Sequence, residues 1–288
     1  MNTQKGNIFF TTSEIPARLR ELANPPAQLF CRGTSLADLL ARPCVAIVGS
    51  RKVTTYGRTV TEQLASELAR QGVVIISGLA VGVDGIAHRA ALAAGGLTIA
   101  VLPCGLERIY PASHRQLAED IVKNGGALVT EYAAGAIAYK LNFIARNRIV
   151  AGLADAVLVT EAALKSGTLH TARFALEQGK DVLAVPGNIN SPTSEGTNNL
   201  IRSGAALVAS ATDVLQILGL DPTTAKAKVR GSTPAEQLIL DFLVAGLQDG
   251  SALLAATGLS AASFNQALTM LEISGSIRAL GGNQWALR

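Results

Sequence analysis

The sequence predicts an α/β protein in which a doubly wound, mostly parallel sheet is followed by a small C-terminal winged-helix domain. Between residues 44 and 208, short β-branched runs alternate with helical patterns, as strands and helices alternate in a parallel sheet. Glycine contributes 28 residues and aromatic residues only 4%, a composition that suits tight strand-to-helix turns. After residue 233 the alternation stops, and three helical patterns precede a short hairpin.

Seven apolar runs supply the expected parallel strands. Each is short and bounded by glycine, proline or polar residues. In a doubly wound sheet, ligands bind at the carboxyl ends of the strands, where the strand order reverses, so functional residues are expected directly after these runs. The expected strands cover residues 44–50, 73–78, 97–102, 127–131, 155–161, 181–187 and 205–210.

Composition divides the chain into four segments. Residues 1–43 are expected to form an N-terminal arm, and residues 44–220 the Rossmann-like sheet domain. Residues 221–233, DPTTAKAKVRGST, are polar and basic without apolar periodicity, which predicts a linker. Residues 234–288 carry 2 Lys and Arg against 4 Asp and Glu, so the last domain is acidic.

The last domain, residues 234–288, has the pattern of a winged helix-turn-helix. Thr233 and Ser260 are candidate N-caps, and two short strands flank Gly281-Gly282. The expected recognition helix, residues 260–272, contains no Lys or Arg. Because a helix that reads a DNA groove normally brings cations to the phosphates, this domain is expected to contact protein rather than duplex DNA.

Overall composition excludes several classes of protein. With 49% hydrophobic and 16% charged residues, the chain is globular rather than disordered. No run reaches the roughly 18 apolar residues of a membrane-spanning helix, and the N-terminus lacks a signal-peptide core. Three cysteines without CxxC spacing offer no disulfide frame or zinc knuckle. These features predict a cytoplasmic protein with no membrane partner.

Glycine turns at strand ends are the first candidate binding feature. Gly49-Ser50-Arg51 follows the first strand, Ser77-Gly78 follows the second, and Ser166-Gly167-Thr168 opens a later helix. Free backbone amides and the helix dipole make such turns potential phosphate cradles, although plain turn geometry is an equal alternative. The first turn is not GxGxxG and no acidic residue ends the second strand, so dinucleotide binding lacks its fingerprint.

A basic cluster without acidic residues is the second candidate feature. Residues 132–154 contain no Asp or Glu. Cations and one aromatic ring in this pattern suit a groove that tracks a nucleic-acid backbone and stacks a base. The alternatives are core packing for the phenylalanine and, for the arginines, a solvated face or a role in holding helix ends. The cluster consists of Lys140, Phe143, Arg146, Asn147 and Arg148.

Catalytic and metal sites find little support in the sequence. Asp84 and His88 lie four apart on one predicted helix and are expected to face each other, with a structural hydrogen bond favoured over acid-base work. His114 and His170 stand alone, and no two histidines have metal-ligand spacing. No catalytic residue, metal or cofactor is therefore predicted.

Several long strings resemble the DNA-processing protein A family, DprA, also called Smf. They follow the family's order over most of residues 25–218. Departures from the family pattern are Asn142 and Ile144, where proline is common, and His170, where a hydrophobic residue is usual. The matching strings are PPAQLFCRG, AIVGSRKVTTYGR, SGLAVGVDGIAHRAAL, TIAVLPCGLERIYPASHRQL, NFIARNRIVAGLADAVLVTEAALKSGTLHTA and AVPGNINSPTSEGTNNLIRSGA.

The resemblance implies an extended Rossmann domain that binds single-stranded DNA, forms a homodimer, protects incoming DNA and helps load a RecA-type recombinase in natural transformation. It implies a mediator rather than an enzyme. Positions matching the family's strand-binding motifs are Gly49, Ser50, Arg51, Ser77, Gly78, Lys140, Phe143, Arg146, Asn147 and Arg148.

The sequence also allows two other functions to be considered. Related Rossmann-like folds include phosphoribohydrolases that cleave nucleoside monophosphates, but their PGGxGTxxE string is not matched by the spacing between Pro186 and Thr197. A transcription factor with a ligand-sensing sheet domain is the third reading, and the acidic C-terminal domain weighs against it.

Overall fold

The computed structural model describes residues 8–10, 15–220 and 231–287. The chain divides into two compact units, Met1–Thr224 and Ala225–Arg288. Most of the linker expected at residues 221–233 lies outside the described residues.

The described part of the first unit contains one sheet of nine strands in the order β1-β2-β6-β5-β4-β3-β7-β8-β9. The strands from β6 to β9 are parallel, and β1 and β2 are antiparallel to their neighbours, which confirms the predicted mostly parallel sheet. The strands are β1 (Ile8–Phe10), β2 (Leu29–Gly33), β3 (Cys44–Gly49), β4 (Val74–Ser77), β5 (Thr98–Val101), β6 (Ala127–Thr130), β7 (Ala156–Glu161), β8 (Asp181–Ala184) and β9 (Ala206–Leu207).

The strand order reverses between β3 and β7. The chain steps outward from β3 through β4 and β5 to β6, then returns to place β7 on the other side of β3, where Val45 pairs with Ala156. Since such a reversal opens a crevice at the carboxyl ends of the two strands, the topology predicts a ligand-binding crevice near the ends of β3 and β7.

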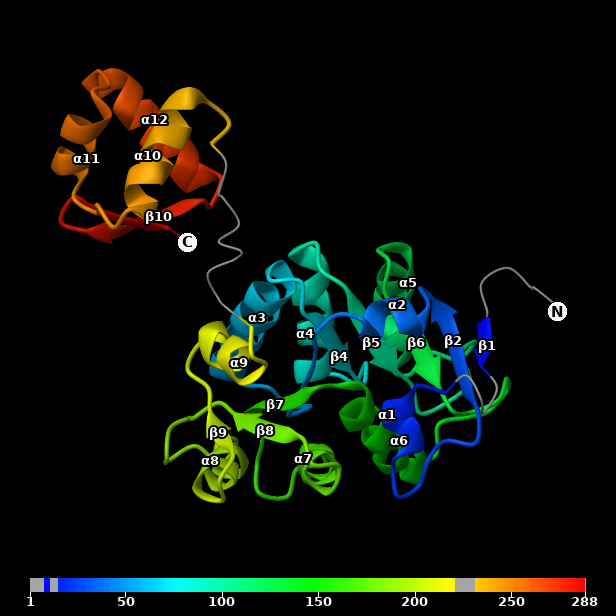
Figure 1. The fold of residues 1–288 in the computed structure, drawn as a ribbon. Coiled ribbons are helices and arrows are strands. Elements are labelled where there is room, and N and C mark those ends of the chain that lie inside the picture. Colours follow the sequence, from blue (N-terminus) through cyan, green and yellow to red (C-terminus); the bar gives the residue numbers. More distant parts are fainter. Residues whose placement is uncertain (1–7, 11–14, 221–230, 288) are drawn as a thin grey trace. The chain divides into compact units, whose positions relative to one another are not determined.

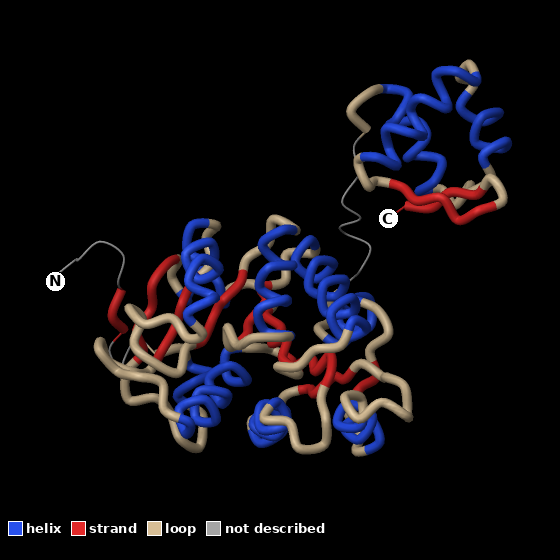
Figure 2. Tube along the Cα trace, turned by 180° about the vertical axis from the view of Figure 1, so that it is seen from behind, coloured by secondary structure: helices blue, strands red, loops and turns tan. Residues whose placement is uncertain are grey.

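Helices cover both faces of this sheet (Figure 1). On one face lie α3, α4, α5 and α9, and on the other α1, α6, α7 and α8. Figure 2 shows the same layers from behind. None of the helices in the described ranges is long and apolar enough to cross a membrane. The helices are α1 (Ala17–Arg20), α2 (Leu36–Leu40), α3 (Thr55–Arg70), α4 (Val83–Ala93), α5 (Arg115–Lys123), α6 (Lys140–Leu153), α7 (Thr168–Glu177), α8 (Glu195–Arg202) and α9 (Ala211–Ile217).

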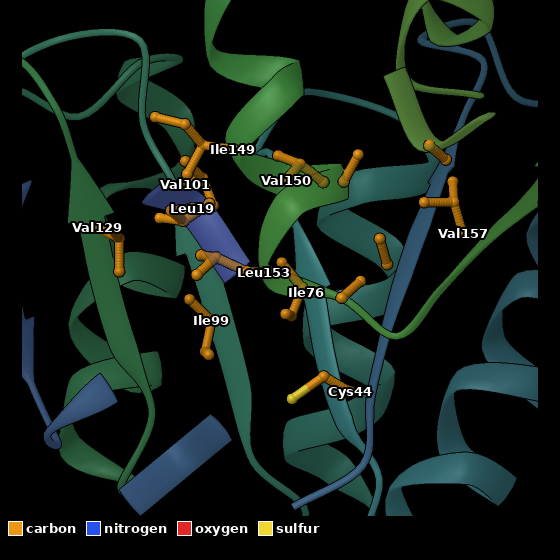
Figure 3. Close-up of a cluster of buried hydrophobic side chains, with 14 of the residues drawn as sticks. Leu19, Cys44, Ile76, Ile99, Val101, Val129, Ile149, Val150, Leu153 and Val157 are labelled. Atoms are coloured by element: carbon orange, nitrogen blue, oxygen red, sulfur yellow. The ribbon is translucent and has the colours of Figure 1, made fainter. Parts of the chain in front are cut away.

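Burial on both faces explains why the parallel strands are continuous apolar runs. Every residue of β3, β4, β5, β6 and β7 is buried. Between the sheet and α6, Ile76 and Ile99 pack with Ile149, Leu153 and Leu19 (Figure 3). Each such side chain stabilises the fold by roughly 1.5–3 kcal/mol, so this layer fixes α6 firmly against the strands.

The N-terminal segment differs from the predicted arm. Within residues 1–43, β2 joins the sheet beside β6, with Phe30 opposite Thr130. Arg32 pairs with Glu119 on α5, one guanidinium nitrogen lying 2.9 Å from the carboxylate. The strand was not predicted because it carries a charged residue, Arg32, precedes the regular strand–helix alternation and joins the sheet antiparallel.

The second unit is the predicted winged helix. Three helices, α10 (Pro234–Val244), α11 (Gly250–Thr257) and α12 (Ala261–Ile273), precede the hairpin of β10 (Ile277–Gly281) and β11 (Gln284–Leu287). The two expected N-caps are present, since the Thr233 hydroxyl accepts from the Glu236 backbone N–H at 3.2 Å and Ser260 accepts from Ser263 at 3.2 Å.

His88 is a buried structural residue of α4, but its partner is not the one predicted. Its Nδ1 lies 2.6 Å from the Thr98 hydroxyl, which donates its own proton to the Ile75 carbonyl. Nδ1 therefore donates, and the deprotonated Nε2 has no partner. Burial is the main cause that lowers the pKa of His88 to about 3. The expected pairing with Asp84 is wrong.

This burial predicts a loss of stability in mild acid. The unfolded chain binds a proton below about pH 6.5, whereas folded His88 resists protonation down to about pH 3, so acidification favours unfolding. From about pH 7.5 to about pH 5, the free energy of unfolding should fall by about 2 kcal/mol more in the parent chain than in His88→Leu. Urea unfolding followed by circular dichroism measures this difference.

The exposed His170 provides the control. His170→Leu should leave the pH dependence of the parent chain unchanged. Equal pH dependence in the parent and in His88→Leu would contradict the assignment.

Candidate nucleic-acid interface

Four loops lie at the end of the sheet where the parallel strands finish. This end is the C-terminal edge of the sheet, and it carries the candidate site. Residues 50–54 follow β3, residues 78–82 follow β4, residues 102–111 follow β5, and residues 162–167 follow β7. The three predicted glycine turns follow β4, β3 and β7, which are adjacent in the sheet in that order, so the turns are neighbours.

The Gly49-Ser50-Arg51 turn is fixed from both sides. A Cβ on Gly49 would lie 2.6 Å from Val83 Cγ2, so only glycine fits between the sheet and α4. Thr168 donates its hydroxyl proton to the Gly49 carbonyl at 2.8 Å, and the Ser50 N–H donates to the Glu161 carbonyl at 2.8 Å. The turn leaves the Arg51 side chain exposed at the edge.

The third turn has a mixed role. Thr168 is buried by its bond to Gly49, whereas Ser166 is half-buried and Gly167 exposed. The Thr168 N–H donates to the Ser166 hydroxyl at 3.3 Å. The exposed part of this turn is therefore small.

The Ser77-Gly78 turn is a support rather than an open cradle. Ser77 is fully buried and donates its hydroxyl proton to the Ile47 carbonyl at 2.6 Å. The Gly78 N–H donates to the buried Asp84 carboxylate at 3.1 Å, as Ala80 does at 3.4 Å. Burial raises the pKa of Asp84, against the lowering effect of Arg146 and these two N–H groups.

Arg146 and Arg148 do not form the open cationic cluster that the sequence predicted. Arg146 is 3% exposed and donates to the carbonyls of Gly78 and Val101. Burial lowers its pKa to about 10, which leaves the guanidinium charged at neutral pH. Arg148 is 8% exposed, because its contacts hold it inside the protein.

Arg148 joins three parts of the chain. Its two terminal nitrogens donate to the Glu131 carboxylate at 2.7 and 2.6 Å, and Nε donates to the Asn24 carbonyl at 2.8 Å. Of the two readings left open for this residue, the structure therefore favours the one in which it holds α6 in place.

An outward-facing cluster remains at the edge, made of Arg51, Tyr110, Lys140 and Phe143. The guanidinium carbon of Arg51 lies 5.3 Å from the centre of the Phe143 ring, within cation–π range. Tyr110 meets the same ring edge-on, with centroids 5.1 Å apart and planes at 72°. Phe143 is half-buried, and Arg51, Tyr110 and Lys140 are exposed, so this is a surface site rather than core packing.

Helical spacing explains why these side chains gather. Lys140, Phe143 and Arg146 are three apart on α6 and share one face. Arg146 anchors that face to the ends of β4 and β5, which carries Phe143 and Lys140 to the same edge. Asn147, on the neighbouring strip of the helix, is half-buried.

Tyr110 is the site residue that sequence reasoning missed. It lies in the loop after β5 and is 50% exposed. An aromatic residue on a loop at the carboxyl end of a predicted strand was the signal that could have identified it. No group of three or more His, Cys, Asp and Glu residues among those described could hold a metal ion.

Comparisons with known proteins agree on a family. Residues 7–219 match the family model described as DNA recombination-mediator protein A, and residues 223–283 match the DprA winged helix domain. The chain belongs to the DNA recombination-mediator protein A family. It is 46% identical over 203 residues to Protein Smf of Escherichia coli, covering 70% of this chain and 54% of that protein. It is 44% identical over 200 residues to DNA processing protein DprA of Streptococcus pneumoniae, covering 69% and 70%.

Two solved structures of DprA proteins share the fold. The Streptococcus pneumoniae DprA structure matches with a TM-score of 0.68 and 42% identity, over 74% of each chain. The Helicobacter pylori DprA structure, described as giving insight into a unique single-stranded DNA binding mode, matches with a TM-score of 0.67 and 37% identity, over 74% of this chain and 95% of that one. The chain spans about half the length of the Escherichia coli and Mycobacterium tuberculosis relatives.

Within this DprA-family chain, removing one member of the buried Arg148–Glu131 pair should destabilise the fold. Arg148→Met should lower the free energy of unfolding by about 3 kcal/mol, because it leaves the Glu131 carboxylate partly buried without its partner. Urea unfolding measures the loss.

The exposed Arg173–Glu177 pair on α7 is the matched control. Arg173→Met should change the free energy of unfolding by less than about 1 kcal/mol. Equal effects of the two substitutions would show that Arg148 is not a structural anchor.

Proposed function

We propose that this chain binds single-stranded DNA at the edge formed by Arg51, Tyr110, Lys140 and Phe143. The observation that carries the proposal is the Phe143 ring, held at the surface between a guanidinium and a second ring. A ring in this position offers a stacking face to a base, and the flanking cations offer charge to its phosphates.

The geometry supports a preference for single strands. A duplex hides the faces of its bases in the stack, so it can offer the cations its phosphates but cannot offer Phe143 a base. In an unpaired strand both contacts form together. Ser50, Ser166 and Gly167 lie next to Arg51 and Thr168 along the same edge and are proposed to line the path of the strand, whereas the buried Gly49 is proposed to hold the turn in place.

Arg146, Arg148, Ser77 and Thr168 are proposed to act indirectly. Their polar groups bind backbone carbonyls or Glu131 inside the protein, so they hold the loops and α6 in place for the residues that meet the strand.

The biological role we propose is that of a recombination mediator. The family is described as a DNA recombination mediator, and the Helicobacter pylori relative is described as binding single-stranded DNA. On this proposal the cytoplasmic chain acts as a homodimer, protects incoming strands and helps load a RecA-type recombinase, without catalysing a reaction. Release of free base from nucleoside monophosphates, measured by chromatography, would contradict the non-catalytic role.

The winged helix is proposed to contact protein. Its α12 contains no Lys or Arg, and it exposes Met270 and Ile273. Steep, salt-dependent binding of duplex DNA by the full chain would argue against this assignment.

Removing the ring should weaken strand binding. Phe143→Ala is expected to reduce affinity for a single-stranded oligonucleotide by about tenfold, because stacking on an aromatic side chain contributes about 1–3 kcal/mol per base. Fluorescence anisotropy with a labelled strand, with unlabelled duplex as competitor, measures both affinity and strand preference.

Phe143→Tyr is the matched control because it keeps the ring, and it should retain most of the affinity. Binding that is unchanged in Phe143→Ala, or equal competition by duplex, would overturn the proposed site.

Removing a cation should change the salt dependence. Lys140→Ala and Arg51→Ala should each make the plot of log affinity against log salt shallower by about 0.7, the value expected for one phosphate contact in a single strand. Anisotropy titrations at several salt concentrations give the slopes.

Lys123→Ala is the matched control. Lys123 is exposed at the C-terminal end of α5, directly before β6, and therefore at the opposite edge of the sheet. It should leave the slope unchanged, and an equal change in all three variants would place the strand elsewhere.

A further inference from the structure

A second concave feature lies at the same edge of the sheet, away from Phe143. It is a pocket of about 700 Å³, within the size range of ligand sites. Thr54 and Tyr56, at the start of α3, form one wall, and Asn188, Ser191 and Ser194, in the loop after β8, form the other. The loop of residues 50–54 separates the pocket from the Phe143 cluster.

The pocket lies at the point where the strand order reverses. Its two walls follow β3 and β8, which flank β7 in the sheet. The Tyr56 hydroxyl donates to the Pro186 carbonyl at 2.7 Å and thus links the walls across the end of β7. This is the position at which doubly wound sheets bind their ligands.

The walls are held in shape by hydrogen bonds that do not involve a ligand. The Asn198 amide accepts from the Gly187 N–H at 3.1 Å and donates to the Gly187 carbonyl at 3.0 Å. On the other wall, Thr54 is bound to the buried Glu161 carboxylate through its hydroxyl and, at 3.2 Å, through its N–H. The pocket is therefore preformed, which reduces the conformational entropy that the protein must lose when a ligand binds.

The lining indicates an uncharged ligand with a flat ring. Hydroxyl groups, one amide and backbone groups line the pocket, and no Lys, Arg, Asp or Glu is among its lining residues. The Tyr56 side chain, 49% exposed, supplies an aromatic face. In a nucleic acid the charge lies on the phosphates, and the base is the flat, neutral part with hydrogen-bonding edges.

We propose that this pocket takes a second nucleobase of the strand that stacks another of its bases on Phe143. The proposal rests on the proposed single-strand binding. Arg51 and Lys52, both exposed on the separating loop, lie where the phosphates between the two bases cross it. The Asn188 amide and the Ser191 and Ser194 hydroxyls meet the edge of the base, so this pocket, unlike the Phe143 ring, distinguishes one base from another.

Two-site occupancy can be tested with 2-aminopurine, a fluorescent base whose emission is quenched when it stacks on an aromatic ring. The probe is placed at each position in turn of a short single-stranded oligonucleotide, which is bound to the full chain. Two separate positions should be quenched. Tyr56→Ala should abolish quenching at one of them and Phe143→Ala at the other, each with a loss of affinity of about tenfold.

Tyr56→Phe is the matched control for the stacking face. It keeps the ring and removes only the bond to Pro186, so quenching at the second position should persist. Free 2-aminopurine riboside tests the other source of a nucleobase. Quenching of the riboside that Tyr56→Ala abolishes, without a second quenched position in the strand, would overturn the assignment to the strand.

The outcomes separate the two proposals. Strand binding with a single quenched position, unaffected by Tyr56→Ala, would overturn the second base site and leave the proposed function intact. Failure of the parent chain to bind the strand at all would overturn both.

Discussion

The arrangement of the site depends on the buried guanidinium of Arg146. It donates to the carbonyls of Gly78 and Val101, at the ends of β4 and β5, and thereby fixes the rotation of α6 against the sheet. Gly78 must be glycine because the guanidinium occupies the place of a Cβ. One turn earlier on the helix, Phe143 then reaches Arg51 and Tyr110. Without this anchor, α6 would lose the buried hydrogen bonds that fix its position relative to the loops after β4 and β5.

Burying this charge is costly, and the surroundings show how the cost is offset. Burial lowers the pKa of Arg146 and raises that of Asp84, while each charge moves the pKa of the other back toward its usual value. Asp84 also accepts from two N–H groups of the loop after β4. Since such buried pairs contribute little net stability, the physical role that best accounts for this one is to specify the geometry of the edge.

The sequence predicted the parallel strands well, because strands buried on both faces are continuous apolar runs that local reasoning can detect. It did not predict β2: this strand carries Arg32 and lies outside the strand–helix alternation of residues 44–208, so it was assigned to an arm. It also placed Arg146 and Arg148 among the residues that contact the strand, with a role in holding helix ends left open as an alternative. Charge counting along the chain cannot separate a solvated arginine from one whose partners, Glu131 and distant carbonyls, come from other strands.

Placing two arginines inside the protein changes the physical basis of the proposed strand binding. If the whole cluster faced outward, attraction to phosphates would dominate, and a duplex, with its higher charge density, would compete strongly. With Arg146 and Arg148 committed to the framework, the exposed cations are Arg51, which lies against the Phe143 ring, and Lys140, one turn earlier on α6, so stacking would carry a larger share of the proposed binding energy. A base can stack only where it is unpaired. Because internal contacts keep Arg146 and Arg148 away from the phosphates, the surface around Phe143 would select single strands over duplexes.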